Sequence, residues 1–218
     1  MRIAGRTGVV TGVDGPIGAA IARGLVAAGV RLSVEAADKT LARSIAAGIG
    51  ADPVSAGWAE ETSPDILVDA APLPAMGPRL SEAGAWEDAL LASGRALSRA
   101  ATCAARMPRD GAILVVSALP AALPMAGWLV PLLAWREAAV ATLARELAPQ
   151  GIRVNGLAPV LGTGGRLPGF LQRGAASAPA TPLSRAATPP EVAQAALWLL
   201  ETDLVTGLTL PLDGGRRL

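Results

Sequence analysis

Residues 8–18 read GVVTGVDGPIG, the pattern of a strand that turns through glycines into a helix. Residues 8–11 form a short β-branched run that predicts a buried strand. The glycines that follow predict a tight turn into a helix over residues 17–28. A strand joined to a helix by a glycine-rich turn opens a βαβ unit, from which parallel sheets are built. Free N–H groups at the start of such a helix attract phosphate.

The same alternation of short apolar runs and longer helical patterns continues to the end of the chain. Further strands are expected at residues 31–34, 66–68, 113–116, 152–154 and 206–211, and further helices at 41–47, 86–107, 129–147 and 191–200. Gly48 is expected to stop the helix over 41–47. Residues 1–218 therefore predict a single α/β domain, a Rossmann-type doubly wound parallel sheet of about seven strands with helices on both faces.

The third connection of this sheet is unusually short. Only about a dozen residues separate Pro53 from Asp65, and a parallel crossover needs at least that many. The helix normally found there is therefore predicted to be missing or shortened to one turn.

Composition argues against several classes of partner. The net charge is +1, and the charges are interspersed along the sequence, so nothing favours nucleic acid or a membrane surface. The uncharged residues 111–135 are interrupted by prolines, which favours a core strand, a loop and a buried helix over a membrane span. The lone Cys103 rules out an intrachain disulfide and fits a reducing cytoplasm, where we expect the protein. We expect no bound metal.

The last third of the chain resembles the short-chain dehydrogenase/reductase family. Residues 146–155, ELAPQGIRVN, are similar to the family's ELAxxGIRVN segment, and residues 182–185, 190–193 and 206–215 are similar to its closing motifs. The glycine turn resembles the family's TGxxxGxG pattern, with Pro16 at the middle glycine. The resemblance implies NAD(P) binding and a homodimer or homotetramer that pairs the helices over 86–107 and 129–147. Trp128 and Trp135 are candidate residues for that interface.

If a nucleotide binds, the resemblance assigns it to residues of the glycine turn and of later strand ends, namely Gly12, Asp14, Gly15, Ile17, Gly18, Glu35, Ala71, Pro159 and Thr163. Two features of the turn oppose binding: Pro16 lacks an N–H group, and Asp14 places a negative charge beside the pyrophosphate. The family's ribose-binding acid aligns with Ala36, and Glu35 points to the other face of the strand. The cofactor is therefore either NAD(P) or none.

The residues that carry the family's catalysis are largely replaced. The family uses a serine, a Tyr-x-x-x-Lys pair and an asparagine, and the tyrosine delivers the proton. Counting back from residues 146–155 places Leu133 at the tyrosine position and Glu137 at the lysine position. The asparagine aligns near Ala92 or Ser93, and Ser117 survives.

No other residue of the chain supplies the missing groups. The chain has no tyrosine and no histidine, and its single lysine, Lys39, belongs to the helix on the adenosine side. General acids and bases come mostly from histidine, carboxylates, lysine, tyrosine and cysteine. The remaining candidates for catalysis are Ser117, Glu137 and Asp69. Each also has a structural interpretation: Ser117 as a loop cap, Glu137 as a solvated or interface residue, and Asp69 as an acceptor of backbone N–H groups.

Three functions fit these observations. The favoured one is a non-redox member of the family that acts as an interaction or structural subunit, either a homodimer or the inactive partner of an intact family subunit. The second is a non-redox enzyme of the cyclase, lyase or isomerase type, using Ser117 with Glu137 or Asp69. The third is an NAD(P)-dependent oxidoreductase with an atypical proton donor.

Arg95, Arg99 and Arg106 form a stripe on the helix over 86–107, for which a solvated face is the favoured interpretation.

Overall fold

The computed structural model describes residues 2–54, 57–71, 83–118, 129–160 and 181–215. Its strands are β1 (Thr7–Thr11), β2 (Arg31–Glu35), β3 (Asp52–Pro53), β4 (Ile66–Asp69), β5 (Ala112–Val116), β6 (Arg153–Pro159) and β7 (Thr209–Leu212). Its helices are α1 (Pro16–Ala27), α2 (Lys39–Ile49), α3 (Trp58–Glu61), α4 (Ala83–Ala104), α5 (Leu129–Leu147), the short 3₁₀ turn η2 (Ala148–Gln150) and α7 (Pro189–Glu201).

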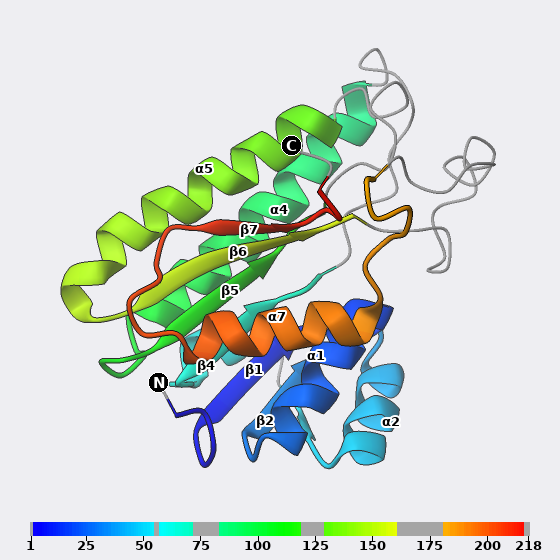
Figure 1. Ribbon diagram of the computed structural model, residues 1–218. Helices are drawn as coiled ribbons and strands as arrows, with labels where there is room; N and C mark the ends of the chain where they lie inside the picture. Colours follow the sequence, from blue (N-terminus) through cyan, green and yellow to red (C-terminus); the bar gives the residue numbers. More distant parts are fainter. Residues whose placement is uncertain (1, 55–56, 72–82, 119–128, 161–180, 216–218) are drawn as a thin grey trace.

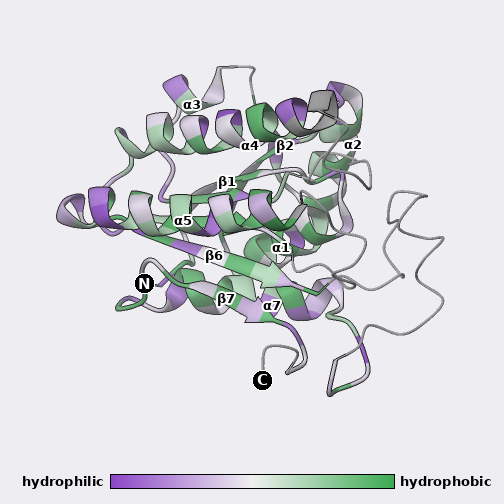
Figure 2. Ribbon diagram, turned by 90° about the horizontal axis from the view of Figure 1, so that it is seen from above, coloured by the Kyte–Doolittle hydropathy of each residue, from purple (hydrophilic) through white to green (hydrophobic). Residues whose placement is uncertain are grey.

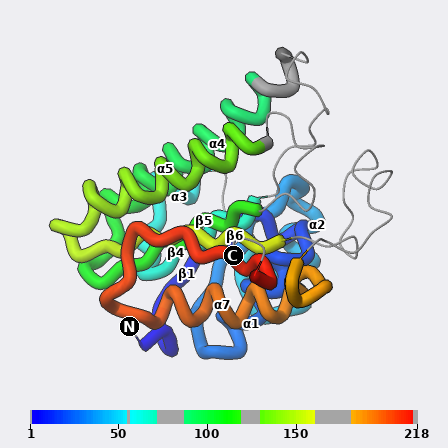
Figure 3. The backbone as a smooth tube through the Cα atoms, turned by 45° about the horizontal axis from the view of Figure 1, so that its top comes forward, coloured from blue at the N-terminus to red at the C-terminus, as the bar shows by residue number. Residues whose placement is uncertain are grey.

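The strands form one parallel sheet in the order β3-β2-β1-β4-β5-β6-β7. Helices α1, α2 and α7 lie on one side of the sheet, and α4 and α5 lie together on the other (Figures 1 and 3). The doubly wound α/β fold predicted from the sequence is thereby confirmed. Within the described part of the chain, no helix is both long enough and apolar enough to cross a bilayer.

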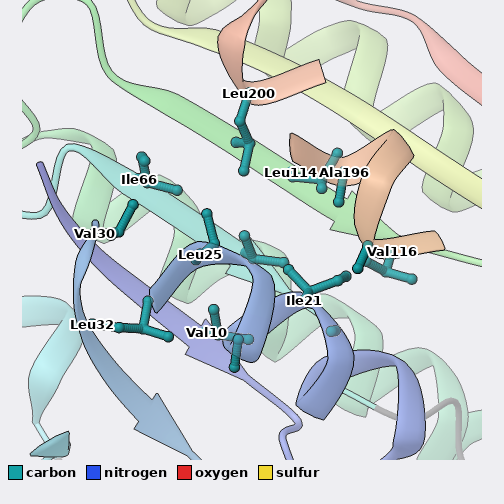
Figure 4. Close-up of a cluster of buried hydrophobic side chains, with 14 of the residues drawn as sticks. Val10, Ile21, Leu25, Val30, Leu32, Ile66, Leu114, Val116, Ala196 and Leu200 are labelled. Carbon is teal, nitrogen blue, oxygen red and sulfur yellow. The ribbon is translucent and has the colours of Figure 1, made fainter. Parts of the chain in front are cut away.

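Alternating side chains of the central strands β1, β4, β5 and β6 build two separate cores. Val10 of β1 packs with Ile21 and Leu25 of α1, beneath α7 (Figure 4). Val9, one residue earlier, packs on the opposite side with residues of α4 and α5. This alternation follows from the two-residue period of a strand, and it fixes the face on which each later polar residue lies.

The shortened third crossover is confirmed. Strand β3 has two residues and α3 has four, a single helical turn. Trp58 of α3 is 2% exposed and packs in the core on the α4 side of the sheet. Figure 2 shows α3 beside α4. The single turn of α3 thus contributes one large buried side chain, Trp58, where a longer helix would contribute several.

Helix α2 is longer than the sequence predicted. Asp38 caps its start by accepting a hydrogen bond from the Leu41 N–H at 2.8 Å. The helix runs past Gly48 and ends at Gly50, whose φ is +75°. The expectation that Gly48 stops the helix is wrong because an interior glycine costs only about 1 kcal/mol, whereas the left-handed C-cap strongly favours glycine.

The chain reverses its direction of winding between β1 and β4, which are neighbours in the sheet. In open α/β sheets, ligands bind in the crevice at the carboxyl ends of the two strands on either side of such a reversal. Thr11 and Asp69 end these two strands and stand opposite each other in the register. The candidate site is therefore at these two residues.

Candidate functional site

A buried ion pair occupies this edge of the sheet. Asp69 is 4% exposed and Arg136 of α5 is 2% exposed. The Arg136 Nη2 atom lies 3.1 Å from Asp69 Oδ2. Asp69 Oδ1 accepts hydrogen bonds from the Thr11 hydroxyl at 3.0 Å and from the Ala71 N–H at 3.3 Å. Both carboxylate oxygens are thus engaged inside the protein, and the bond from Ala71 is of the kind that the structural interpretation of Asp69 predicted.

The guanidinium of Arg136 also joins α5 to α4 and β5. Its Nη1 donates to the Ser93 hydroxyl at 3.4 Å, and its Nη2 donates to the Val116 carbonyl at 3.1 Å. Ser93 is buried, whereas Ala92 is exposed. Of the two residues aligned near the family's asparagine, Ser93 is therefore the one that faces the site.

Ser117 lies directly after β5 at the same edge. Its N–H donates to the Leu157 carbonyl at 2.8 Å, and the residue is 8% exposed. The strand period directs its side chain to the α4 and α5 side of the sheet, like that of Val115. Among the described residues, neither the Ser117 hydroxyl nor the Arg136 Nε–H has a hydrogen-bond partner. Two buried polar groups at this edge therefore remain unsatisfied.

The structure places the other two residues of the predicted catalytic set differently. Leu133 is buried at 6% exposure, and Glu137 is half-buried. The α5 side chain that reaches Asp69 is Arg136, one residue before Glu137. The structure thus brings Asp69 and Ser117 to one edge, and a role for Glu137 with them stays a prediction.

The glycine turn is shaped by close backbone contacts. Gly12 has a φ of +71°, and a Cβ atom there would lie 2.3 Å from the Ala70 carbonyl oxygen. A Cβ atom at Gly18 would lie 2.2 Å from the Gly12 carbonyl oxygen. These two positions require glycine for packing alone, whether or not a ligand binds.

Glu35 at the end of β2 is engaged on the α4 side of the sheet. Its Oε1 accepts a hydrogen bond at 2.7 Å from Arg99, whose guanidinium also lies 5.7 Å from the centre of the Trp58 ring. Of the three arginines of the stripe, Arg95 and Arg106 are exposed, as the solvated-face interpretation predicted, whereas Arg99 is half-exposed and engaged by Glu35 and Trp58. A cation beside a carboxylate and over an indole ring fastens α4 to the end of β2.

Comparisons with known proteins place this geometry in a family. Residues 63–217 match the family model described as enoyl-(acyl carrier protein) reductase. The chain superimposes with a TM-score of 0.84 on a short-chain dehydrogenase/reductase family protein that is 28% identical, over 99% of this chain and 98% of that one. The chain belongs to the short-chain dehydrogenase/reductase family.

Two further relatives agree with this family. A short-chain dehydrogenase/reductase from Brucella melitensis, described as a glucose/ribitol dehydrogenase, is 25% identical over 98% of this chain and 97% of its own, with a TM-score of 0.86. Carbonyl reductase family member 4 from Danio rerio is 43% identical over 77 residues, which are 35% of this chain and 32% of that protein. The match therefore spans about a third of this relative's length.

Side chains of residues 152–155, within the segment that resembles the family, form hydrogen bonds that hold the fold together. Arg153 donates to the carbonyls of Leu199 and Leu200 at 2.9 and 2.6 Å, which caps the carboxyl end of α7. The Asn155 amide donates to the Val205 carbonyl at 2.8 Å and accepts from the Leu208 N–H at 3.2 Å. Residues 152–155 thus hold α7 and the start of β7 against β6, independently of any catalytic role.

The family's dinucleotide fits the residues of this chain poorly. Pro16 has no N–H, and the N–H groups of Val13 and Gly15 donate to the carbonyls of Glu35 and Gly12 at 3.1 Å. Asp14 is exposed at the same turn. Among the other residues assigned to a nucleotide, Ile17 packs against the core, and the Ala71 N–H donates to the Asp69 carboxylate. Pro159 is buried, and Thr163 lies outside the described residues. In the described part of the chain, no cluster of three or more histidine, cysteine or acidic residues is arranged to hold a metal.

Arg136 is the site residue that the sequence analysis missed. Leu132, Arg136, Val140 and Ala144 follow one another at intervals of four residues and are all buried. An arginine inside a buried stripe needs a buried acidic partner, and this periodicity was the signal available in the sequence.

Proposed function

We propose that this chain is a non-redox member of the short-chain dehydrogenase/reductase family and acts as a structural or interaction subunit. The observation that carries the proposal is the Arg136–Asp69 ion pair at the crevice of the sheet, in a chain without tyrosine or histidine. Reduction of a carbonyl requires a proton for the developing alkoxide. The single lysine, Lys39, is exposed at the start of α2.

The cation at the site is a poor substitute for a proton donor. A guanidinium keeps its proton throughout the accessible pH range, so Arg136 can orient and neutralise charge but not act as a general acid. Its charge is already opposed by Asp69 at 3.1 Å. Ser117 alone is a weak acid. Because neither Arg136 nor Ser117 is a good proton donor, we expect no ordinary carbonyl reduction at this site.

The redox part of the proposal is tested by nicotinamide turnover. The purified chain is mixed with NADH or NADPH and with acetoacetyl-CoA as a ketone or crotonyl-CoA as an enoyl thioester. The two substrates follow from the carbonyl reductase and enoyl reductase similarities. We expect no oxidation above the rate without protein. Oxidation at enzymatic rates that persists through repeated purification would contradict the proposal.

The subunit part rests on apolar side chains exposed on the paired helices α4 and α5. Leu91 is 57% exposed, Val130 42% and Trp135 37%. Trp128, the other tryptophan expected at an interface, lies outside the described residues. Exposed apolar side chains on two adjacent helices suit a second chain of the same fold, whose own α4 and α5 would cover them.

Sedimentation analysis tests this assembly. We expect the wild-type chain to be a dimer or larger, and Leu91→Glu with Trp135→Glu to shift it toward monomer. Leu204→Glu is the matched control, because Leu204 is 96% exposed in the loop between α7 and β7. A chain that is monomeric alone and does not co-purify with an intact family member would contradict the proposal.

A second candidate is a non-redox enzyme that uses Ser117. The observation in its favour is the buried, unsatisfied Ser117 hydroxyl beside the Asp69 site. Hydration of crotonyl-CoA, followed in the wild type and in the Ser117→Ala and Glu137→Gln variants, tests this candidate. Turnover that disappears in either variant would favour it, and an inactive wild type would count against it for this substrate.

A further inference from the structure

We infer that this chain does not bind nicotinamide dinucleotides, because at each of the three parts of the family's binding site the residues present are poorly suited to the nucleotide or are already bonded within the protein. This inference deepens the proposed function, since a chain that is merely slow in catalysis would still hold its nucleotide. It concerns binding alone, and binding can be measured separately from turnover.

The first part is the anion site at the start of α1. A helix start binds phosphate through N–H groups that have no partner within the helix. Here Pro16 supplies none, and the N–H groups of Val13 and Gly15 are bonded at 3.1 Å within the turn and to β2. Asp14 exposes a carboxylate at the same turn, which repels a pyrophosphate.

The retained glycines do not argue for a nucleotide. Gly12 and Gly18 are held by backbone contacts in which a Cβ atom would lie 2.3 and 2.2 Å from a carbonyl oxygen. These packing constraints would be the same in a protein that binds no ligand. The glycine pattern is therefore fully explained by the fold.

The second part is the acid for the adenosine ribose. Glu35 leaves β2 on the α4 side and is paired with Arg99 at 2.7 Å. Val34, which precedes it, packs in the core on the α1 side, as expected for alternating side chains. Ala36 and Ala37, which follow, offer no polar side chain. The carboxylate nearest the ribose position thus already has a cation as partner.

The third part is the nicotinamide end. There the Arg136 guanidinium and the Asp69 carboxylate neutralise each other, and Thr11, Ala71, Ser93 and the Val116 carbonyl provide further bonds. Opening this network for a nucleotide would leave two buried charges without partners, which is strongly unfavourable. Both charges at this edge thus already have a partner within the protein.

Calorimetric titration of the full chain with NADH, NADPH, NAD⁺ and NADP⁺ tests the inference. We expect no saturable heat and no rise in the unfolding temperature with added nucleotide, from a sample whose cooperative unfolding shows that it is folded. An intact family reductase is the positive control. Saturable binding would overturn the inference, and binding without turnover would leave the non-redox proposal standing.

A gain-of-binding variant tests the assignment to the turn. Asp14→Ser with Pro16→Gly removes the charge and restores one N–H, while keeping Gly12 and Gly18. We expect its affinity for ADP to exceed that of the wild type by about tenfold or more. Gly48→Ala, in the exposed part of α2, is the matched control and is expected to bind no better than the wild type. An affinity that does not change in the turn variant would contradict the assignment of the obstacle to the turn.

Discussion

The Arg136 guanidinium on α5 and the Asp69 carboxylate at the end of β4 lie 3.1 Å apart, and both side chains are almost completely buried. They are 67 residues apart in the sequence, and their contact joins a helix to the sheet at the crevice where an α/β domain ordinarily binds its ligand. The central polar contact of this edge is therefore internal.

Removing one member of this pair is expected to destabilise the fold more than removing both. Asp69→Leu or Arg136→Met alone leaves one buried charge without a partner, and we expect a loss of about 3–5 kcal/mol in the free energy of unfolding. In the double variant Asp69→Leu, Arg136→Met, apolar side chains replace both charges, so the loss should be smaller than in either single variant. Urea denaturation measures all of these values. Additive losses in a double-mutant cycle would show that the two residues act independently.

The glycines of the turn are expected to be indispensable for folding. Gly12→Ala places a Cβ atom against the backbone of Ala70, which cannot move aside as the end of a flexible side chain would. We expect a loss of at least about 3 kcal/mol, or no folded protein. Gly48→Ala is the control: its Cβ atom meets nothing within 4 Å in helix α2, and we expect it to stabilise the fold by about 0.5–1 kcal/mol. A well-folded Gly12→Ala variant would contradict the packing explanation of the turn.

Acid is expected to weaken the link between β1 and the start of β4. Burial alone raises the pKa of Asp65, but hydrogen bonds from the Thr7 N–H, from Arg6 and from the Thr7 hydroxyl outweigh it, so the pKa lies below its ordinary value. A lowered pKa in the folded state stabilises the protein above the pKa of the unfolded chain, and this contribution is lost as the pH falls through the folded value, below about pH 4.

Asp65→Asn tests this dependence. At pH 7 we expect the variant to be less stable by about 1.5–3 kcal/mol, because hydrogen bonds to a charged group are lost. The difference should narrow as the pH falls below about 4, where the unfolded wild-type chain takes up a proton, and it should vanish once the pH is below the lowered pKa of Asp65 in the folded protein. Denaturation curves at pH 7 and pH 3 measure it. A difference that is the same at both values would rule out the carboxylate as its source.

Cys103 is expected to be unreactive in the folded protein. Burial raises the pKa of its thiol to about 11, with a smaller opposing effect from Arg106. At pH 8 on the order of a thousandth of it is thiolate, and the side chain is fully buried. Alkylation by iodoacetamide should therefore be at least about a hundredfold slower than in urea. Rapid alkylation of the native chain would show that the α4 core opens readily.

The local sequence predicted most of the strands and helices, but it placed no strand at β3, and the strand predicted over residues 152–154 continues in β6 to Pro159. The apolar stretch over residues 129–147 predicted α5 with the bounds that the structure shows, and the dozen residues between Pro53 and Asp65 predicted that the helix there is missing or, as found in α3, a single turn. The end of α2 was missed by two residues because both Gly48 and Gly50 are plausible stop signals, and only the backbone conformation distinguishes them.

The amino-acid sequence was enough to predict the parallel sheet and the family, and it contains no tyrosine or histidine to deliver a proton. The pairing of polar groups became known from the folded structure: Arg136 with Asp69, Arg99 with Glu35, and Ser93 rather than Ala92 at the site. The physical reason is that hydrophobic periodicity and turn chemistry act within a few residues. The partner of a buried charge depends instead on the rotation of a helix against strands that are distant in the chain.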